Sequence, residues 1–270
     1  RAVLGVAFGF LLTVILGRRF IAWMRTCRAT EDVSKPDSAA LSRLHAGKQG
    51  TPTMGGVMIV AAMTGSLLLA GDLTNLLVLL GLAVLLGFGS LGFIDDYVKL
   101  RGWGKRGLTQ QQKLFLQCAI AGGAALVLYA LVQHGLYALT GGVTPKPEGR
   151  FVTCLLVPFT KWKECQPDLG GAYYVLFALV IVACSNAVNL TDGLDGLASG
   201  CTIMVAATFA VLAYVAGNAK IAGYLQIPYV PASGELAVFC AIMVGVVMGF
   251  LWYNVHPAEV FMGGTGSLAL

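Results

Sequence analysis

Long apolar stretches alternate with short polar segments along almost the whole of this chain. A helix needs about 20 apolar residues to cross a bilayer. Seven stretches approach that length, and an eighth begins near residue 265. The pattern predicts an all-α, polytopic transmembrane bundle, and no internal repeat or low-complexity tract divides it. We therefore expect one membrane domain over residues 1–270, with spans at roughly 2–23, 54–71, 74–94, 114–133, 172–188, 201–216 and 236–253.

The basic residues are unevenly distributed between the two ends of the predicted helices, which predicts the orientation of the bundle. Loops 17–53 and 95–113 carry seven and five Lys or Arg residues, whereas the opposite face carries six. Cytoplasmic loops are enriched in Lys and Arg, so this face, together with 186–200 and 254–264, is assigned to the cytosol. Segment 134–171 then becomes a long extracytoplasmic loop, in which a small hairpin or an interfacial element is expected.

The composition supports a membrane protein. Hydrophobic residues make up 57% and charged residues 11%, and the mean hydropathy is +0.78, whereas a soluble domain is about 25% charged. The net charge of +5 does not indicate nucleic-acid binding, because the basic residues lie in separate loops. The chain begins at Arg1 without Met and ends just inside an apolar run, so we expect it to be truncated at both ends.

The seven cysteines show no metal-ligand spacing. Cys154 and Cys165 share the extracytoplasmic loop, and a disulfide between them is left open. Four others lie in apolar stretches and are expected to be small buried hydrophobes, namely Cys118, Cys184, Cys201 and Cys240.

Asp95 and Asp96 follow an apolar span directly and are the first candidates for chemistry. Ionisable groups at membrane depth are expensive and usually functional. Two adjacent carboxylates repel each other unless a divalent metal or Lys99 compensates them. Neighbours on a helix are about 100° apart, so we expect one side chain to face the site and the other a basic partner. The alternative, a solvated helix end, explains the pair poorly, because acids at a helix C-terminus oppose its dipole.

Asp192 and Asp195 form a second acidic motif on the same face. They are three residues apart and can share a face of one helical turn. Neighbouring glycines allow backbone to approach a ligand closely, and Asn189 adds an amide. Oxygen ligands without sulfur favour Mg²⁺ over Zn²⁺. Alone, the motif also fits an ordinary loop; together, the two motifs predict a magnesium site.

Lys48, Lys99 and Lys113 lie close to these acids along the chain. Mg²⁺ surrounded by lysines is a common arrangement for binding a pyrophosphate, although each lysine also serves as a topology determinant. The glycine-rich segment 50–56 has no Gly-Lys-Ser/Thr, so an ATPase loop is not expected. For His256, two interpretations are left open, namely contact with substrate and a role at the protein surface.

Four motifs together carry a family resemblance: GTPTMGG at 50–56, GFIDDYVK at 92–99, NAVNLTDGLDGLA at 186–198 and NVHPAEVFMG at 254–263. Through them the chain resembles the phospho-N-acetylmuramoyl-pentapeptide transferases of the polyprenyl-phosphate N-acetylhexosamine-1-phosphate transferase superfamily. The resemblance implies ten helices in a full-length member, and an Mg²⁺-dependent active site on the cytosolic face of the bacterial inner membrane. It implies transfer of phospho-MurNAc-pentapeptide from UDP-MurNAc-pentapeptide to undecaprenyl phosphate, which yields UMP and lipid I for peptidoglycan synthesis. A homodimer is left open.

The resemblance also assigns roles to residues at matching positions. Asp95 and Asp96 match the acidic pair, one of which is proposed to activate the lipid phosphate, and Asp192 matches an active-site and metal position. The other positions implied to be catalytic or substrate-binding are Lys48, Thr53, Lys99, Lys113, Asn189, Asp195 and Phe261, the last an aromatic that packs on uracil.

Two departures from the family pattern concern activity. Gly264 stands where the family has an aspartate that binds Mg²⁺, and glycine offers no carboxylate. The chain also stops before the last helices and before a His-rich loop that helps to recognise the donor. We therefore expect the polypeptide as written to be weakly active or inactive.

Three other readings are kept at this point. A sister enzyme that transfers GlcNAc-1-phosphate shares this kind of acidic motif, whereas the wording of GTPTMGG and HPAEVFMG favours the muramoyl enzyme. A transporter would place its acids near the midplane rather than at one surface. An inactive membrane scaffold would account for Gly264.

Overall fold

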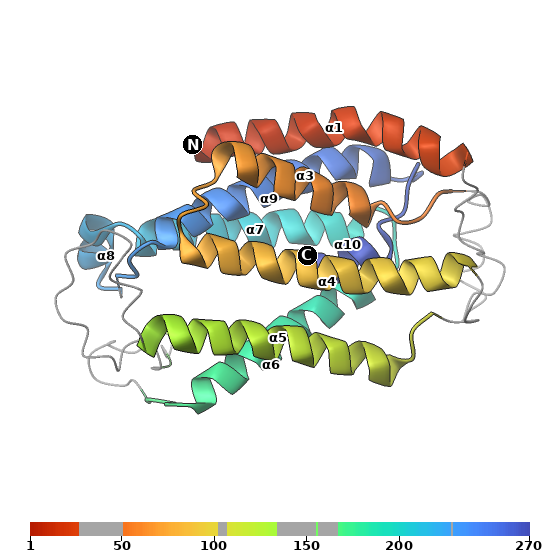
Figure 1. The fold of residues 1–270 in the computed structure, drawn as a ribbon. Coiled ribbons are helices and arrows are strands. Elements are labelled where there is room, and N and C mark those ends of the chain that lie inside the picture. Colours follow the sequence, from red (N-terminus) through yellow and green to blue (C-terminus); the bar gives the residue numbers. More distant parts are fainter. Residues whose placement is uncertain (27–50, 102–106, 134–154, 156–166, 228) are drawn as a thin grey trace.

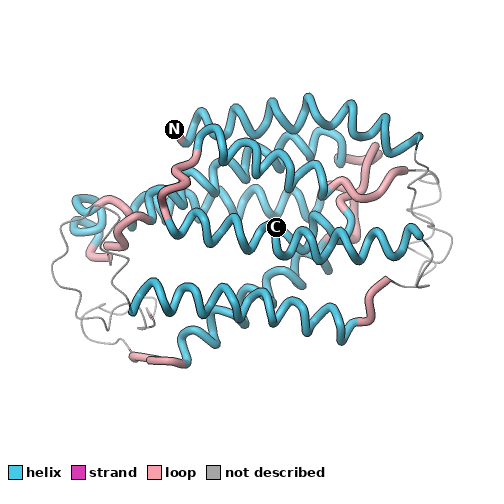
Figure 2. Tube along the Cα trace, in the orientation of Figure 1, coloured by secondary structure: helices cyan, strands magenta, loops and turns pink. Residues whose placement is uncertain are grey.

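A computed structural model of the chain describes residues 1–26, 51–101, 107–133, 155, 167–227 and 229–270. Lys48, Cys154, Cys165 and most of segment 134–171 lie outside these ranges, so the expectations for them stay predictions. The described residues form helices and no strand (Figure 2). The helices are α1 (Ala2–Thr26), α3 (Gly56–Ala70), α4 (Leu76–Arg101), α5 (Gln110–Gln133), α6 (Ala172–Thr191), α7 (Leu197–Ala216), α8 (Ala219–Leu225), α9 (Ser233–Asn254) and α10 (Gly263–Ala269).

Six of these helices are long and apolar enough to cross a membrane, namely α1, α4, α5, α6, α7 and α9. The expected all-α polytopic bundle is therefore confirmed. Helix α3 has 15 residues rather than the 18 expected at 54–71, and at about 1.5 Å per residue it is about 22 Å long. Met54 has a left-handed φ of 70°, so the helix begins only after it. The free N–H groups of Gly55 and Gly56 at this start donate to the carbonyls of Phe261 and Met262 at 2.9 and 2.8 Å.

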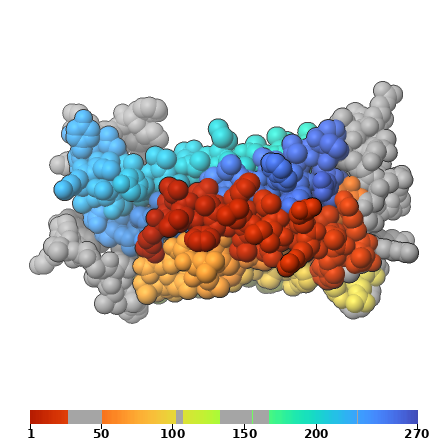
Figure 3. All heavy atoms as spheres, turned by 90° about the horizontal axis from the view of Figure 1, so that it is seen from above, coloured from red at the N-terminus to blue at the C-terminus, as the bar shows by residue number. Residues whose placement is uncertain are grey.

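The long helices lie side by side, with α8 at one end of the bundle (Figure 1). Helix α1 covers α9 and α3, and seen from above it lies across that face of the molecule (Figure 3). Helix α7 packs along the same α9, and the short α10 lies among α3, α4 and α6. Helix α6 packs against α5 and crosses it obliquely (Figure 1). The ends of elements distant in sequence therefore meet at the end opposite α8.

Small residues explain why α1 packs so closely on α9. The buried face of α1 repeats every four residues, through Gly5, Gly9, Thr13 and Gly17. A Cβ at Gly9 would lie 3.0 Å from the carbonyl oxygen of Ile242 in α9. Because lipid provides little hydrophobic driving force between helices, close packing of small residues is a common way for them to associate in membranes.

The interior of the bundle is apolar, and many large side chains on its outside are apolar too, as a lipid-facing surface requires. The prediction that four cysteines are buried is wrong for three of them, because Cys118, Cys184 and Cys201 are exposed on this outer surface. The fourth, Cys240, is half-buried. A hydropathy pattern does not tell which face of an apolar helix turns outward.

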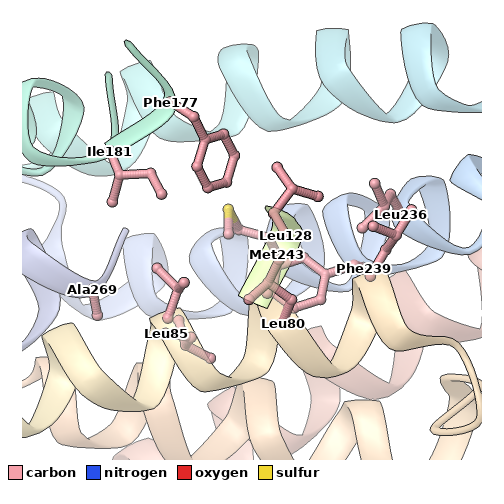
Figure 4. A pocket seen from close by; sticks show the side chains of 12 residues that line it. Leu80, Leu85, Leu128, Phe177, Ile181, Leu236, Phe239, Met243 and Ala269 are labelled. Atoms are coloured by element: carbon pink, nitrogen blue, oxygen red, sulfur yellow. The ribbon is translucent and has the colours of Figure 1, made fainter. Parts of the chain in front are cut away.

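An apolar cavity of about 340 Å³ lies between α4, α5, α6 and α9. Leu80 and Leu85 of α4, Phe177 of α6 and Met243 of α9 line it, and Ala269 of α10 stands at one end (Figure 4). The cavity carries no charged residue among those that line it, so the polar chemistry of the molecule is sought elsewhere.

Candidate active site

The acidic pair lies in the last turns of α4, at the end of the bundle opposite α8 (Figure 1). Both side chains are buried, with about one twentieth or less of their surface exposed. Asp95 accepts hydrogen bonds at both oxygens, from Lys99 Nζ at 2.7 Å and from the backbone N–H of Leu108 at 2.8 Å. The pair is thus buried in protein rather than on a solvated helix end.

Asp95 fixes the start of α5 through this bond to Leu108. The next residue, Thr109, forms a reciprocal capping pair with Gln112: the Thr109 N–H donates to Gln112 Oε1 at 3.2 Å, and the Gln112 N–H donates to Thr109 Oγ1 at 3.3 Å. Such a capping box satisfies backbone donors that the first helical turn leaves unpaired. Asp95 therefore helps to place Lys113, which lies in the first turn of α5.

Asp96 turns to the beginning of α10 instead. It accepts the backbone N–H of Gly264 at 3.0 Å, and the N–H and hydroxyl of Thr265 at 2.8 Å each. Lys99 Nζ lies 3.9 Å from Asp96 Oδ1, the oxygen that accepts from Gly264. The two carboxylates face different partners, as expected: Asp95 pairs with Lys99, and Asp96 faces α10. That Asp96 faces the reacting groups stays a prediction.

Gly264 lies directly against this pair. A Cβ at that position would lie 2.9 Å from Asp96 Oδ1 and 3.5 Å from Asp95 Oδ2. A side chain at position 264 would therefore enter the space beside both carboxylates. Gly263 adopts a φ of 73°, which favours glycine, and a Cβ there would meet Thr53 Oγ1 at 3.2 Å. Thr53 is thus brought to the same corner of the molecule.

Phe261 is held beside Thr53 by backbone hydrogen bonds. Its N–H donates to the Pro52 carbonyl at 2.9 Å, and its carbonyl accepts the Gly55 N–H at 2.9 Å. The GTPTMGG and VFMG motifs are therefore paired with each other in space. Phe261 itself is half-buried, so part of its ring stays accessible.

Asn189 of α6 joins α5 to α10. Its amide donates to Ser267 Oγ at 2.7 Å, and its carbonyl oxygen accepts from Lys113 Nζ at 3.4 Å. Ser267 Oγ donates in turn to the Gly263 carbonyl at 3.0 Å. Three predicted site residues, Asp96, Lys113 and Asn189, are thus connected through the first turn of α10.

Asp192 and Asp195 do not share a helical turn as expected. Helix α6 ends at Thr191, and the residues from Asp192 to Gly196 form a turn before α7. Asp192 is the residue that ends α6, and Gly196, with a left-handed φ of 74°, separates Asp195 from the start of α7. The spacing of residues in the sequence does not reveal that the helix ends here.

The side chain of Asp195 is buried and contacts the 255–260 segment. It accepts the Ala258 N–H at 3.3 Å, and its carboxylate lies 3.1 Å from Nδ1 of His256, whose own side chain is exposed. The nearby Asn254 was missed by sequence reasoning. Its buried amide accepts from Gly196 N–H and Ser199 Oγ at 3.1 Å each and donates to the Val260 carbonyl at 3.0 Å.

Further residues missed at the sequence level are polar groups on α5, α6 and α10, namely Gln117, Ser185, Thr265 and Ser267. Gln117 carried the clearest signal, because it is the one amide between residues 114 and 132 of an apolar stretch and lies one helical turn after Lys113.

Across the described part of the chain, no group of three or more His, Cys, Asp or Glu residues is arranged to hold a metal ion. The acidic pair offers oxygen donors only, which suits Mg²⁺, an ion often bound by one or two carboxylates plus phosphate and water. The donor chemistry fits Mg²⁺ with two carboxylates rather than three, and position 264 adds none. Every carboxylate oxygen of the pair also accepts from a donor of the chain itself.

Comparison with known proteins gives consistent matches. The model of glycosyl transferase family 4 matches residues 76–270, and signature 1 of the phospho-N-acetylmuramoyl-pentapeptide-transferases matches residues 48–60. Proteins with that transferase name are similar to the whole chain: the one from Oleidesulfovibrio alaskensis is 43% identical, that from Nitratidesulfovibrio vulgaris 44% and that from Citrifermentans bemidjiense 43%. In each case 100% of this chain aligns with 69% of the relative.

Proposed function

We propose that the end of the bundle that holds Asp95 and Asp96 is the active site of a phospho-MurNAc-pentapeptide transfer. The premise is that this chain belongs to the phospho-N-acetylmuramoyl-pentapeptide transferase family. The protein is a multi-pass membrane transferase of peptidoglycan synthesis. Its donor is UDP-MurNAc-pentapeptide and its acceptor a polyprenyl phosphate, for which we propose undecaprenyl phosphate. The observation that supports the site most is the meeting of residues from all four motifs around one end of the bundle.

The chemistry requires charge neutralisation more than covalent catalysis. An oxygen of the acceptor phosphate attacks the sugar-linked phosphorus of the donor, the bond from that phosphorus to the bridging oxygen breaks, and UMP leaves. Phosphoryl transfer of this kind depends on positioning and electrostatics. Lys99 is about half exposed and Lys113 is half-buried beside Asn189, so both can present positive charge to these anions.

We propose Mg²⁺ as the cofactor, which Asp95 and Asp96 would hold. Asp192, a metal position by the family resemblance, forms no three-carboxylate group with them in the described part of the chain. When bound, the ion would neutralise the phosphate oxygens and offset the repulsion between adjacent carboxylates. The pair then has two functions in this chain: Asp95 orders the start of α5, and Asp96 orders the start of α10. Because no carboxylate stands at position 264, we propose that metal affinity and turnover are low.

Residue roles beyond the acidic pair are also proposals. Thr53, Asn189 and Phe261 lie on segments joined to α10 or to its approach, which supports contact with the donor. Asp195 is proposed to act by holding the 255–260 segment rather than by touching phosphate. Lys48 is carried over from the family alone.

The test is the formation of lipid I by the purified chain in detergent, with UDP-MurNAc-pentapeptide, undecaprenyl phosphate and Mg²⁺. We expect slow turnover that disappears in Asp96→Asn and persists in Asp72→Asn, an acid at the opposite end of the bundle. Preferred use of UDP-GlcNAc would instead indicate the sister GlcNAc-1-phosphate transferase, which the comparisons do not favour. Turnover that Asp96→Asn leaves intact would contradict the site.

The location of the site is proposed to be the cytosolic face of the bacterial inner membrane. Arg18, Arg19 and Arg25 of α1 and Lys99 and Arg101 of α4 belong to the helix ends on this side, as the enrichment of basic residues in cytoplasmic loops requires. A homodimer is proposed as one assembly state, to be tested by measuring the mass of the protein in nanodiscs.

A further inference from the structure

Helices α5 and α6 exchange hydrogen bonds between two amides inside the bundle. Asn186 Nδ2 donates to Gln117 Oε1 at 2.9 Å, and Gln117 Nε2 donates back to Asn186 Oδ1 at 3.4 Å. Gln117 is buried, with 1% of its surface exposed. An amide left unpaired in an apolar environment is costly, and polar pairs of this kind associate helices in membranes. The pair therefore favours one register of α5 against α6.

The same register places two proposed site residues. Lys113 precedes Gln117 by four residues, and Asn189 follows Asn186 by three, so each lies one turn nearer the acidic pair on its own helix. The contact between Lys113 Nζ and Asn189 Oδ1 is accordingly the next rung of the same antiparallel ladder. From Asn189 the contacts continue to Ser267 and the first turn of α10, which Asp96 holds.

Helix α6 is held by apolar packing as well as by polar contacts. Ala178, Ile181 and Val182 pack against a small apolar cluster formed by α4, α5 and α10. Ser185 is the one fully buried residue of this helix, and its hydroxyl donates to the Leu268 carbonyl of α10 at 2.8 Å. The helix crosses α5 obliquely (Figure 1), and exposed apolar side chains such as Val175 and Leu179 contribute little to its register. The polar contacts of Ser185, Asn186 and Asn189 add directional constraints to this packing, because each hydrogen bond requires one particular partner.

We infer that Gln117 and Asn186 are a positioning pair, which sets the register that brings Lys113 and Asn189 to the anionic substrates. The inference rests on the proposed function for its effect on turnover. Its structural part, the position of the Lys113 side chain, can be measured through the reactivity of that amine without any turnover.

The experiment compares three variants of the chain in detergent. Gln117→Leu removes one amide of the pair. The double variant Gln117→Asn with Asn186→Gln exchanges the two side chains and keeps their combined length. Tyr129→Ala is the matched control, because Tyr129 makes an edge-to-face contact with Tyr174, with ring centroids 5.1 Å apart, at the far end of the same two helices.

Two readouts are taken, the steady-state kinetics of lipid I formation and the rate at which an amine-reactive reagent acylates Lys113, followed by mass spectrometry. In Gln117→Leu we expect kcat to fall about 10- to 100-fold, as displacements near 1 Å produce, with the KM for UDP-MurNAc-pentapeptide little changed. Lys113 acylation should become several-fold faster, because Asn189 no longer holds the amine. The exchanged pair should restore both readouts, and Tyr129→Ala should leave both near those of the parent chain after correction for thermal stability.

The inference is overturned if Gln117→Leu and Tyr129→Ala lose activity only in proportion to their lost stability, with unchanged Lys113 acylation. That result would mean ordinary helix packing, and it would leave the proposed function intact. If the parent chain shows no turnover, the proposed function fails, and the acylation rates alone decide: faster acylation reversed by the exchange supports the positioning pair, and unchanged acylation refutes it.

Discussion

The carboxylate oxygens of Asp95 and Asp96 each accept a hydrogen bond from the chain, and through these bonds the two residues position the starts of α5 and α10. One acid accepts from Lys99 and the N–H of Leu108, and the other from Gly264 and Thr265. Donated hydrogen bonds offset the cost of burying two adjacent charges. Because a carboxylate oxygen has two lone-pair sites, a metal ion would share these oxygens with donors of the chain. Position 264 is where a third carboxylate would change that balance.

The substitution Gly264→Asp is predicted to create a magnesium-dependent protein. The new Cβ would lie 2.9 Å from Asp96 Oδ1, so the flexible end of Asp96 must shift slightly. Three close carboxylates repel one another unless a cation is bound. We expect lower thermal stability without Mg²⁺, a gain of about 3 kcal/mol when Mg²⁺ exceeds its Kd by 100-fold, and faster lipid I formation. Gly264→Ala is the control, since it adds the Cβ alone; equal Mg²⁺ dependence in both variants would contradict the prediction.

The substitution Asn254→Ala is predicted to uncouple the two loops at the site. It leaves the Gly196 N–H, the Ser199 hydroxyl and the Val260 carbonyl without their partner. An unsatisfied buried group costs about 1–3 kcal/mol, so the melting temperature should fall together with the rate of lipid I formation. Asn218→Ala removes a helix cap of α8 at the other end and should lower stability without a specific loss of rate. Equal losses of rate in both variants would argue against a role for Asn254 in the site.

At the scale of elements, local patterns predicted what depends on neighbours in sequence. The division of labour at Asp95 and Asp96 followed from helix geometry, because Lys99 lies one turn away on α4. The pairing of Gly55 with Phe261, the contacts of Asp195 and the Gln117–Asn186 pair depend on residues more than 60 positions distant. No periodicity within one segment contains that information. The exposed cysteines were mispredicted for the same reason, since the partner of each helix face was unknown.

The α1–α9 contact gives a prediction for a pair of elements. A Cβ at Gly249 of α9 would lie 2.8 Å from the Phe10 carbonyl oxygen of α1, so Gly249→Ala should separate the helices. Overpacking costs about 1–3 kcal/mol, measurable as a lower midpoint of unfolding in SDS. Gly123→Ala on α5 is the matched control, because no atom lies within 4 Å of its Cβ position, and alanine favours a helix by about 1 kcal/mol over glycine. Equal destabilisation in both would contradict small-residue packing of α1 on α9.

At the scale of the whole molecule, polar chemistry is concentrated at one end of an apolar bundle. The described acids of the site, their lysine partners and the amides of α5 and α6 lie toward the end where α4 finishes and α5 begins. A transferase that joins a water-soluble nucleotide donor to a lipid phosphate needs such a position, at the boundary between the aqueous and lipid phases. A midplane site, typical of transporters, would place the acids within the spans instead.

The orientation of the bundle is testable with single cysteines. After replacement of the native cysteines by serine or alanine, Gln111→Cys marks the start of α5 and Lys220→Cys marks α8, both at exposed positions. Because basic residues favour the cytoplasmic side, the start of α5 should face the cytosol and α8 the outside. An impermeant maleimide added to bacterial spheroplasts, whose inner membrane is intact, should therefore label Lys220→Cys and spare Gln111→Cys. Permeabilised cells, in which both positions should react, supply the control for reactivity. Labelling of Gln111→Cys alone in intact cells would reverse the assigned topology, and with it the proposed access of the nucleotide donor from the cytosol.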